Sequence, residues 1–574
     1  MICGSLGKHG DAGENYGNAL AGIKPVFLSR FLDTLQLRCG VGAVGKDRLH
    51  SGPGSRTFVT MKRRRLVSPG ALSRLFLEAA EAWKRLDYQK TIETLERASH
   101  LDPANTTIHL DLGRAYGLRY NYEAAERCLE QGIRVAPKKS VALAEAGRRC
   151  QEFGNAEMAR RFFERAVKEK DATADVFVIL AELHERHAHL EQATELIERG
   201  LKLDPNHPPT RLARARLDRL SGRLAEAETG VRTLLNSKSD PWLRTRAWYE
   251  LGEILDRLGR FDEAMEAFLS AKAILRPVAS NHATTLHLIQ ARVHEMEQSI
   301  TAAALERWAS AGDALQPVRR FALLCGHPRS GTTLLEQVLD AHPAVVTAEE
   351  THILHDEAYL PLTRGFQVGT PELEILESAP PDRLRQARED YFRFTELYLG
   401  KTVGDKTLVD KNPASNVLIP AAARLFPEAK FLVALRDPRD VCLSCFMQPL
   451  APNPVSSAYL TLETTVTQYL SVIGFWRTLR PRLRNPFFEV RYEDLVGDLE
   501  GVSRRVLDFL GVPWDNRVLR FDEHARTRQL RSPSYAGVTQ PINRRAIGRW
   551  QNYRCHLEPY LDQLAPTLKA LGYD

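Results

Sequence analysis

Apolar positions along the chain follow two different patterns, which divide it into two unlike parts. From about Ala71 to Pro277 they recur at helical spacing, and the whole arrangement repeats: Pro103 and Pro137 are 34 residues apart, and Pro205 lies two such units further on. After this region, short apolar runs of strand length alternate with helical patterns. The chain is therefore expected to join a stack of helix pairs to an α/β domain with a parallel sheet.

Small residues recur at matching places within the repeated units. Gly113, Gly147 and Gly252 each leave room for a second helix to approach closely. The alanines expected at the tight helix crossing, and the large apolar residues four positions after them, are Ala125, Ala159, Ala193, Ala264, Leu129, Phe163, Ile197 and Phe268. The pattern resembles the tetratricopeptide repeat, in about six units whose first and fifth members are degenerate. The resemblance implies an α-solenoid with a concave groove over residues 67–277.

A glycine-bounded loop follows the first strand-length run of the second part. Phe321–Leu324 are apolar, Gly326 and Gly331 bound the loop, and apolar residues then recur at helical spacing. A strand, a tight loop and a helix in this order direct backbone N–H groups and the positive end of the helix dipole toward one point, which suits a phosphate or a sulfate. The spacing is that of a P-loop, but Thr332 stands where its lysine is expected, and the cation of the loop is Arg329.

These residues resemble the 5′-phosphosulfate loop of sulfotransferases, which use 3′-phosphoadenosine 5′-phosphosulfate (PAPS). The nearest likeness is to tyrosylprotein sulfotransferases and their bacterial relatives, which share a PRSGTT loop, a Leu-Asp-x-His-Pro helix end and a Glu-Glu pair. Here these are Pro328–Thr333, Leu339–Pro343 and Glu349–Glu350. The resemblance covers a domain of residues 318–574, which follows a helical connector over residues 278–317. It implies that the 5′-phosphosulfate is held by Arg329, Ser330, Gly331, Thr332 and Thr333.

The same resemblance assigns catalytic roles. Glu350 would take the proton of the acceptor hydroxyl as a general base. The nearby alternatives to this base are His342, His352 and His355. Lys411 and Ser534 would support the negative charge that develops during transfer, with Lys411 placed at the bridging oxygen of the leaving group.

Further segments would hold the nucleotide, again by resemblance. Arg436 and Ser444 would bind the 3′-phosphate, to which the planar fork of an arginine is well matched. Tyr492 would help to hold the nucleotide, and Arg549 would reach its phosphates. The family's second arginine in the 3′-phosphate site is replaced here by Gln448.

The composition of the chain argues against several classes of function but predicts none by itself. The chain has 574 residues, a net charge of +7 with basic residues spread along it, and eight scattered cysteines. A dispersed excess of this size does not predict nucleic-acid binding, and scattered cysteines fit a reducing cytoplasm. The one close pair, Cys442 and Cys445, is expected at buried helix positions, and no ligand cluster in the sequence predicts a metal. No apolar run is long enough to predict a membrane span.

The N-terminal segment has a different composition from the rest of the chain. Residues 1–66 are rich in glycine and polar residues and show no sustained apolar period, which predicts a disordered extension. An alternative hypothesis is that translation begins at Met61.

Taken together, the motifs predict an enzyme that moves the sulfuryl group from PAPS to a hydroxyl acceptor, for which protein tyrosine is the nearest family precedent. A nucleotide kinase or NTPase is an alternative, disfavoured because the P-loop lysine is missing. A second alternative is an inactive sulfotransferase-like repeat scaffold for protein interaction.

The solenoid groove is expected to bind a protein or peptide, either the acceptor itself or another partner. The competing interpretation is a scaffold or a homodimer surface. One predicted helix carries a row of basic residues that would suit an acidic partner or form a solvated face: Arg211, Arg214, Arg216 and Arg219.

Overall fold

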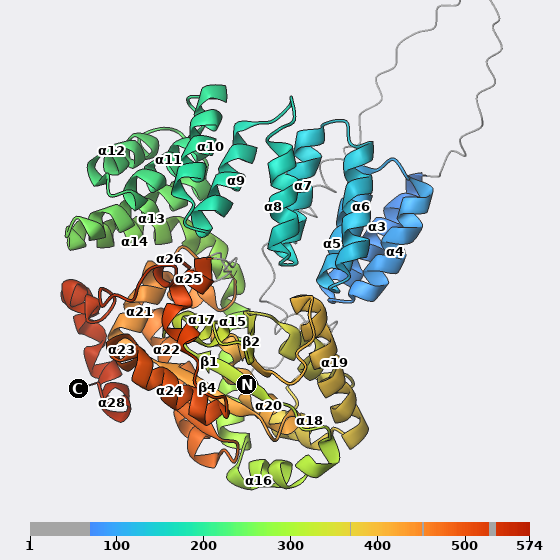
Figure 1. The fold of residues 1–574 in the computed structure, drawn as a ribbon, viewed down its shortest axis with the longest axis vertical. Helices are drawn as coiled ribbons and strands as arrows, with labels where there is room; N and C mark the ends of the chain where they lie inside the picture. The colour runs from blue at the N-terminus through green and yellow to red at the C-terminus, as the bar shows by residue number, and fades with distance from the viewer. Residues whose placement is uncertain (1–68, 368, 451–452, 527–534, 574) are drawn as a thin grey trace, which may run out of the picture.

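The computed structural model describes residues 69–367, 369–450, 453–526 and 535–573. The predicted extension over residues 1–66 and the hypothesis about Met61 fall outside these residues, as does Ser534. Figure 1 shows a stack of helices lying across an α/β part. Among the helices described, none combines the length and the apolar character needed to cross a bilayer.

The repeat part consists of six consecutive helix pairs in the described chain, as the sequence period predicts. The pairs are α3 (Pro69–Lys84) with α4 (Tyr88–Leu101), α5 (Thr106–Leu118) with α6 (Tyr122–Val135), α7 (Lys139–Glu152) with α8 (Ala156–Ala166), α9 (Ala174–Arg186) with α10 (Leu190–Leu203), α11 (Pro208–Leu220) with α12 (Leu224–Leu235), and α13 (Pro241–Arg257) with α14 (Phe261–Ala279). Several of these helices begin at a side chain that accepts backbone N–H groups of the first turn, namely Asp87, Asn105, Asn121, Asn155 and Asp240.

Close packing within a pair requires the predicted glycines. A Cβ atom on Gly147 would lie 2.6 Å from the ring of Phe163, and one on Gly252 would lie 2.6 Å from the ring of Phe268. Both phenylalanines are fully buried. The large side chain of the second helix therefore fills the space that the missing Cβ leaves in the first, and this pairing was visible in the sequence.

The α/β part is built on a five-stranded parallel sheet in the order β2-β3-β1-β4-β5. The strands are β1 (Phe321–Gly326), β2 (Val345–Glu349), β3 (Thr407–Lys411), β4 (Lys430–Leu435) and β5 (Phe487–Arg491). After β1 the chain goes to one side of the sheet for β2 and β3, and then to the other side for β4 and β5. A reversal of this kind opens a crevice at the carboxyl ends of the strands beside β1, where α/β proteins bind ligands.

Helices cover both faces of the sheet, which explains why its strands read as continuous apolar runs. Alternate residues of β1 point to opposite cores: Leu323 packs into one cluster and Leu324 into the other. The first face is covered by α16 (Ala302–Ser310), α19 (Pro381–Leu399), α20 (Ile419–Leu425) and α22 (Leu462–Leu479), and the second by α17 (Thr332–Asp340), α24 (Leu499–Leu510) and α25 (Phe521–Arg526). The connector helix α15 (Ala283–Ser299) precedes α16, whose Trp308 is buried in the first cluster.

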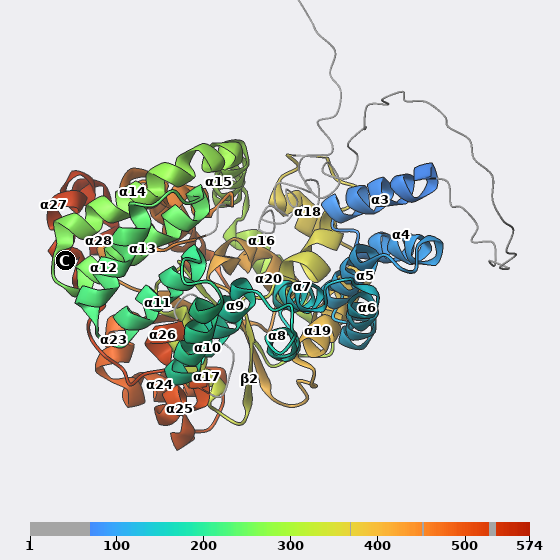
Figure 2. The same ribbon diagram turned by 90° about the horizontal axis from the view of Figure 1, so that it is seen from above.

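The repeat part contacts the α/β part near its N-terminal end, in the second helix pair, and at its C-terminal end, in the last pair. Figures 1 and 2 show the helices between these contacts arched across the α/β part. At one end, Arg119 pairs with Glu357 at 2.6 Å, and Tyr120 packs on the rings of Phe394 and Tyr398. At the other end, one apolar cluster joins α13 and α14 to α21 (Pro438–Met447) and to residues 550–557. The last repeat therefore shares an apolar cluster with helices of the α/β part.

The basic row of α11 is largely paired inside the solenoid. Arg216 lies 2.8 Å from Glu185 of α9, Arg214 lies 3.2 Å from Asp218, and Arg219 is buried against Glu250 of α13. Because these guanidinium groups already face carboxylates of their own or neighbouring helices, they tie the repeats together. The hypothesis that this row attracts an acidic partner loses its main support.

Candidate functional site

A cavity of about 490 Å³ lies at the carboxyl edge of the sheet. Four of the residues predicted for the site line this cavity because each follows the end of a strand: Arg329 follows β1, Glu350 follows β2, Arg436 follows β4 and Tyr492 follows β5. Ser330, Lys411 and Ser444 are not among the described lining residues. The described lining residues are Pro328, Arg329, Gly331, Thr332, Thr333, Leu334, Glu350, Asn412, Pro413, Ala414, Arg436, Cys445, Leu450, Asn453, Val455, Ser456, Tyr459, Tyr492, Val496, Gly537, Val538, Ile542, Asn543 and Ala546.

The loop between β1 and α17 has the geometry of an anion site. Gly326 is in close contact with the neighbouring strand, since a Cβ there would lie 2.5 Å from the carbonyl oxygen of Ala434. Gly331 caps α17 with φ +95°, and a Cβ there would lie 2.7 Å from the ring of Tyr492. Thr332 and Thr333, the first residues of α17, line the cavity, so the N-terminal N–H groups of the helix face it.

Two arginines, Arg329 of this loop and Arg436 after β4, lie next to each other. Arg329 has φ +72°, and its Nε donates to Oγ of Ser444 at 3.0 Å. Arg436 donates to the carbonyl oxygen of Arg329 at 3.2 Å, and its guanidinium lies 4.9 Å from the ring centre of Tyr492. Burial lowers the pKa of Arg329, and the positive charge of the neighbouring Arg436 lowers it further. A bound anion would offset the repulsion between the two guanidinium groups, so the arrangement favours anion binding.

Lys411, the last residue of β3, is fully buried among three carboxylates. Its Nζ lies 2.9 Å from Oε1 of Glu350, 3.1 Å from Oε2 of Glu336 and 3.5 Å from Oε1 of Glu349. Burial by itself lowers the pKa of Lys411, but the three carboxylates raise it above its ordinary value. The ammonium group is therefore kept charged, and it fixes the position of Glu350.

Glu350 is the single carboxylate among the described residues that line the cavity. Its backbone has φ +48°, a conformation rare for residues other than glycine, and its N–H donates to the carbonyl oxygen of Lys411 at 2.6 Å. Its side chain is 29% exposed, whereas that of Glu349 is 5% exposed. The second glutamate of the pair is thus the one presented to the cavity.

The alternative bases lie away from the described lining of the cavity. His342 uses both ring nitrogens, one against the carbonyl oxygen of Pro513 at 2.8 Å and the other with the N–H of Ala344 at 3.1 Å. Nδ1 of His355 is 2.7 Å from a carboxylate oxygen of Asp356. His352, the third alternative, is also outside the lining residues. The geometry therefore favours Glu350 as the group that faces a substrate.

The chain after α26 (Tyr535–Val538) closes one side of the cavity. Asp440 accepts the N–H groups of Gly548 at 2.7 Å and of Trp550 at 2.8 Å, and Arg436 donates to the carbonyl oxygen of Ala546. These bonds hold residues 542–550 beside the two arginines. Ser534, the predicted partner of Lys411, lies outside the described residues.

Arg549 is placed differently from the other predicted cofactor residues. It is absent from the described lining, and its guanidinium lies 2.9 Å from a carboxylate oxygen of Asp256, in α13 of the last repeat. The hydroxyl of Tyr553 donates to the same carboxylate at 2.6 Å. Sequence reasoning missed Asp256, as it missed Glu336 beside Lys411. A charged residue within the apolar face of α17 was the available signal for Glu336, and the sequence held none for Asp256.

A second buried carboxyl, Asp410, lies next to Lys411 in β3. It accepts the hydroxyl of Tyr391 at 2.9 Å, and burial raises its pKa from 3.8 to about 7. Because the folded-state pKa lies above the unfolded one, the protonated carboxyl favours folding. That contribution is present at acid pH and is lost as the pH rises through about 7.

Replacing Asp410 with asparagine is expected to make the protein less sensitive to alkaline pH, because the amide cannot ionise. Relative to wild type, the variant should gain roughly 3 kcal/mol of stability between pH 5 and pH 8. Denaturant unfolding at both pH values measures the difference. Asp405→Asn, at an exposed position before the same strand, is the control and should show no such trend. If Asp410→Asn changed the free energy of unfolding equally at both pH values, the raised pKa of Asp410 would be contradicted.

Two segments of the chain match models of known protein families. Residues 322–516 match the model of the sulfotransferase family, and residues 245–274 match the tetratricopeptide repeat. The chain carries a sulfotransferase domain and a tetratricopeptide repeat. The matched repeat lies within α13 and α14, which are the helices packed against the sulfotransferase domain.

The relatives include protein-tyrosine sulfotransferases of animals. Protein-tyrosine sulfotransferase A of Caenorhabditis elegans is 26% identical over 54% of this chain and 80% of its own length. Protein-tyrosine sulfotransferase 1 of Danio rerio is 28% identical over 43% of this chain and 71% of its own length. An uncharacterized protein of Aquifex aeolicus is 26% identical over 59% of this chain, and the match spans only 44% of that relative's length.

Among solved structures, the sulfotransferase domain of the Synechococcus PCC 7002 olefin synthase is 21% identical, with a TM-score of 0.30. That match covers 41% of this chain and 89% of the other.

Proposed function

We propose that the sulfotransferase domain transfers the sulfuryl group of PAPS to a hydroxyl acceptor. The proposal rests on one cavity that is lined by both Arg329 and Glu350, with the buried ammonium group of Lys411 directly behind Glu350. The anion loop with Arg329 lies at the end of β1, and the Glu350–Lys411 pair lies at the ends of β2 and β3. A nucleotide-binding pocket alone would need the anion loop but not the Glu350–Lys411 pair.

The residues present fit a nucleotide that carries two anionic groups. The N-terminal N–H groups of α17 and the guanidinium of Arg329 suit the 5′-phosphosulfate. Ser444 and Arg436 suit the 3′-phosphate. The buried Nε of Arg436 has no hydrogen-bond partner among the described residues, which leaves one donor available for a ligand. Gln448 replaces a family arginine, so this chain would hold the 3′-phosphate with fewer charges.

When bound, PAPS supplies a sulfuryl group that is activated by its phosphate leaving group. Glu350 would take the proton of the acceptor hydroxyl on its carboxylate. Lys411 would hold that carboxylate in place through the 2.9 Å contact and would provide positive charge beside the reacting group. Ser534 is proposed to act with Lys411. Both glutamate and lysine are held by buried neighbours, so little reorganisation is needed when the substrate binds.

Two observations support a proposal for the acceptor class. A single carboxylate base suits a hydroxyl that has an acidic proton, and the phenol of tyrosine is such a group. The named relatives act on protein tyrosine, and the repeats are expected to bind protein or peptide. We therefore propose a tyrosine-containing peptide as the acceptor.

A transfer assay tests this function. The full chain is incubated with PAPS labelled with ³⁵S and with a tyrosine-containing peptide, and a matched peptide with phenylalanine serves as the control. Label in the tyrosine peptide only, with release of 3′-phosphoadenosine 5′-phosphate, is the expected result. Transfer to small alcohols but not to the peptide would retain the reaction and reject the acceptor.

The last repeat is expected to support cofactor binding through Asp256. Asp256→Asn removes the carboxylate that holds Arg549 and Tyr553, and should weaken the binding of 3′-phosphoadenosine 5′-phosphate by roughly tenfold through loss of a charged pair. The KM for PAPS should rise while kcat changes little.

Two variants control for a general structural effect of this change. Asp256→Glu should restore part of the affinity, and Glu266→Gln, at an exposed position in α14, should have no effect. Tighter binding in Asp256→Asn would show that Asp256 instead withholds Arg549 from the ligand.

A further inference from the structure

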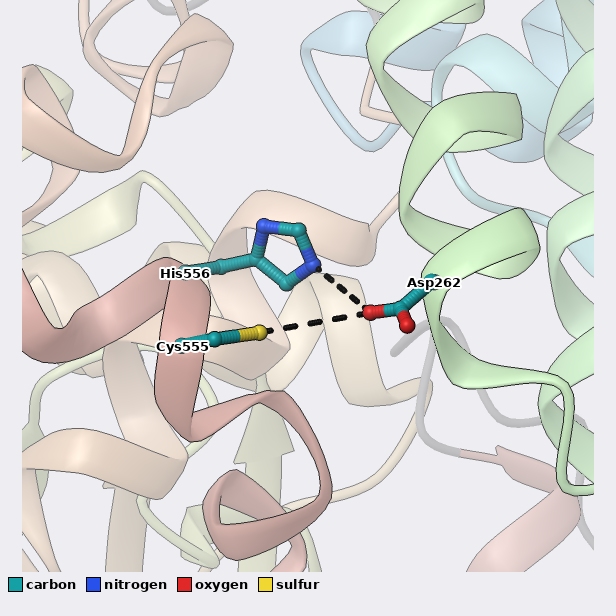
Figure 3. A group of neighbouring side chains, drawn as sticks. All are labelled: Asp262, Cys555 and His556. Carbon is teal, nitrogen blue, oxygen red and sulfur yellow. Dashed lines mark hydrogen bonds and ion pairs between the residues drawn. The ribbon is translucent and has the colours of Figure 1, made fainter.

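Three metal-ligating side chains of different chemistry meet at the junction of the last repeat and the C-terminal segment (Figure 3). Asp262 is in the first turn of α14, and Cys555 and His556 are in α27 (Arg554–Leu557). One ligand atom from each lies within 4.8 Å of the others. In Figure 3 the thiol and the imidazole both point toward one carboxylate oxygen of Asp262.

The distances are close to those of a tetrahedral zinc site. With bonds of about 2.0 Å to nitrogen and oxygen, a tetrahedral zinc ion holds those two atoms about 3.3 Å apart. The observed distance from Nε2 of His556 to Oδ1 of Asp262 is 3.3 Å. A thiolate bond of about 2.3 Å would put sulfur about 3.5 Å from the carboxylate oxygen. Sγ of Cys555 is 4.0 Å from it, so a movement of about half an ångström brings this pair to bonding geometry.

The surroundings suit a surface site with one open position. The side chain of Asp262 is 84% exposed and that of His556 is 32% exposed, so both can adjust and water can reach the fourth position. Of the cysteines described, Cys555 is the exposed one, whereas the others are buried or half-buried. A mixed set of sulfur, nitrogen and oxygen ligands selects zinc over magnesium or calcium, which prefer oxygen alone.

We propose that Asp262, Cys555 and His556 bind one zinc ion, with water as the fourth ligand. Binding replaces the thiol proton of Cys555, which is released to solvent, so affinity rises with pH. The ion links α14 of the repeats to the segment that carries Tyr553 and Arg549, both of which contact Asp256. The zinc site would thus fasten the last repeat to the sulfotransferase domain. This proposal does not depend on the proposed sulfuryl transfer.

Cobalt titration of the full chain tests the site. We expect one Co²⁺ per chain, with tetrahedral visible bands and a thiolate-to-cobalt charge-transfer band that Zn²⁺ then abolishes. Cys555→Ser should remove the charge-transfer band, and Asp262→Asn or His556→Ala should weaken Zn²⁺ binding at least about tenfold. Zn²⁺ should raise the Tm of wild type but not of Cys555→Ser, and a chelator should reverse the effect.

Cys128→Ser, at a half-buried position in α6, is the matched control and should leave the band unchanged. Absence of the band at stoichiometric Co²⁺, or its persistence in Cys555→Ser, would overturn the proposal. In that case the side chains of Cys555 and His556 only hydrogen-bond with Asp262. Because these readouts need neither PAPS nor an acceptor, their failure is distinguishable from failure of the proposed reaction.

Discussion

Replacing Glu350 with glutamine is expected to lower kcat for sulfuryl transfer by about 10²–10⁴-fold, because the amide cannot accept the acceptor proton. Binding of 3′-phosphoadenosine 5′-phosphate should change by less than about threefold, since the arginines and the loop N–H groups are untouched. Turnover is measured with labelled PAPS, and binding is measured by calorimetry on the same preparation.

Glu349→Gln is the matched control for this loss. Glu349 also faces Lys411, at 3.5 Å, but it is not among the described residues lining the cavity. Its replacement should therefore lower kcat far less than that of Glu350. Equal losses in the two variants would show that the carboxylates act by neutralising Lys411 and not through one base.

Replacing Arg329 with alanine is expected to weaken the binding of 3′-phosphoadenosine 5′-phosphate by roughly 10²-fold. The variant loses two charge-assisted hydrogen bonds to the ligand, each worth about 1.5–3 kcal/mol, and Arg436 partly compensates for them. Arg329→Lys should recover only part of the affinity, because an ammonium group cannot reproduce the planar fork. Calorimetric titration of each variant measures the effect.

Arg320→Ala provides the control, since Arg320 is exposed just before β1 and donates to the carbonyl oxygen of Asp405. It should bind the ligand as wild type does. A loss smaller than about threefold in Arg329→Ala would remove the loop arginine from the account of the site.

The residues at the strand ends were predictable from sequence because neighbouring residues determine the local structure that positions them. A buried apolar run followed by Gly326, Arg329 and Gly331 determines a strand, a turn and a helix start within a dozen residues. The repeats were likewise visible, since Gly147 and Phe163 recur with the period of a helix pair. Parallel pairing of the strands then brings the end of each to one edge.

Contacts between distant segments were not predictable in this way. Asp256 reaches Arg549 only because the last repeat packs against α21 and residues 550–557, and nothing near either residue signals that packing. Cys555 and His556 read as an unremarkable pair until α14 brings Asp262 beside them. The basic row of α11 left two interpretations open in the sequence, an acidic partner or a solvated face, because the carboxylates that pair with Arg216 and Arg219 lie on other helices.

The measurement that most directly tests the central claim is calorimetric titration of the full chain with 3′-phosphoadenosine 5′-phosphate, beside ATP with Mg²⁺. We predict one site per chain that binds the 3′,5′-bisphosphate and prefers it to ATP, with an enthalpy of binding that is lost in Arg329→Ala. Absence of bisphosphate binding, or a preference for ATP with Mg²⁺, would contradict the account and would favour a scaffold or a kinase instead.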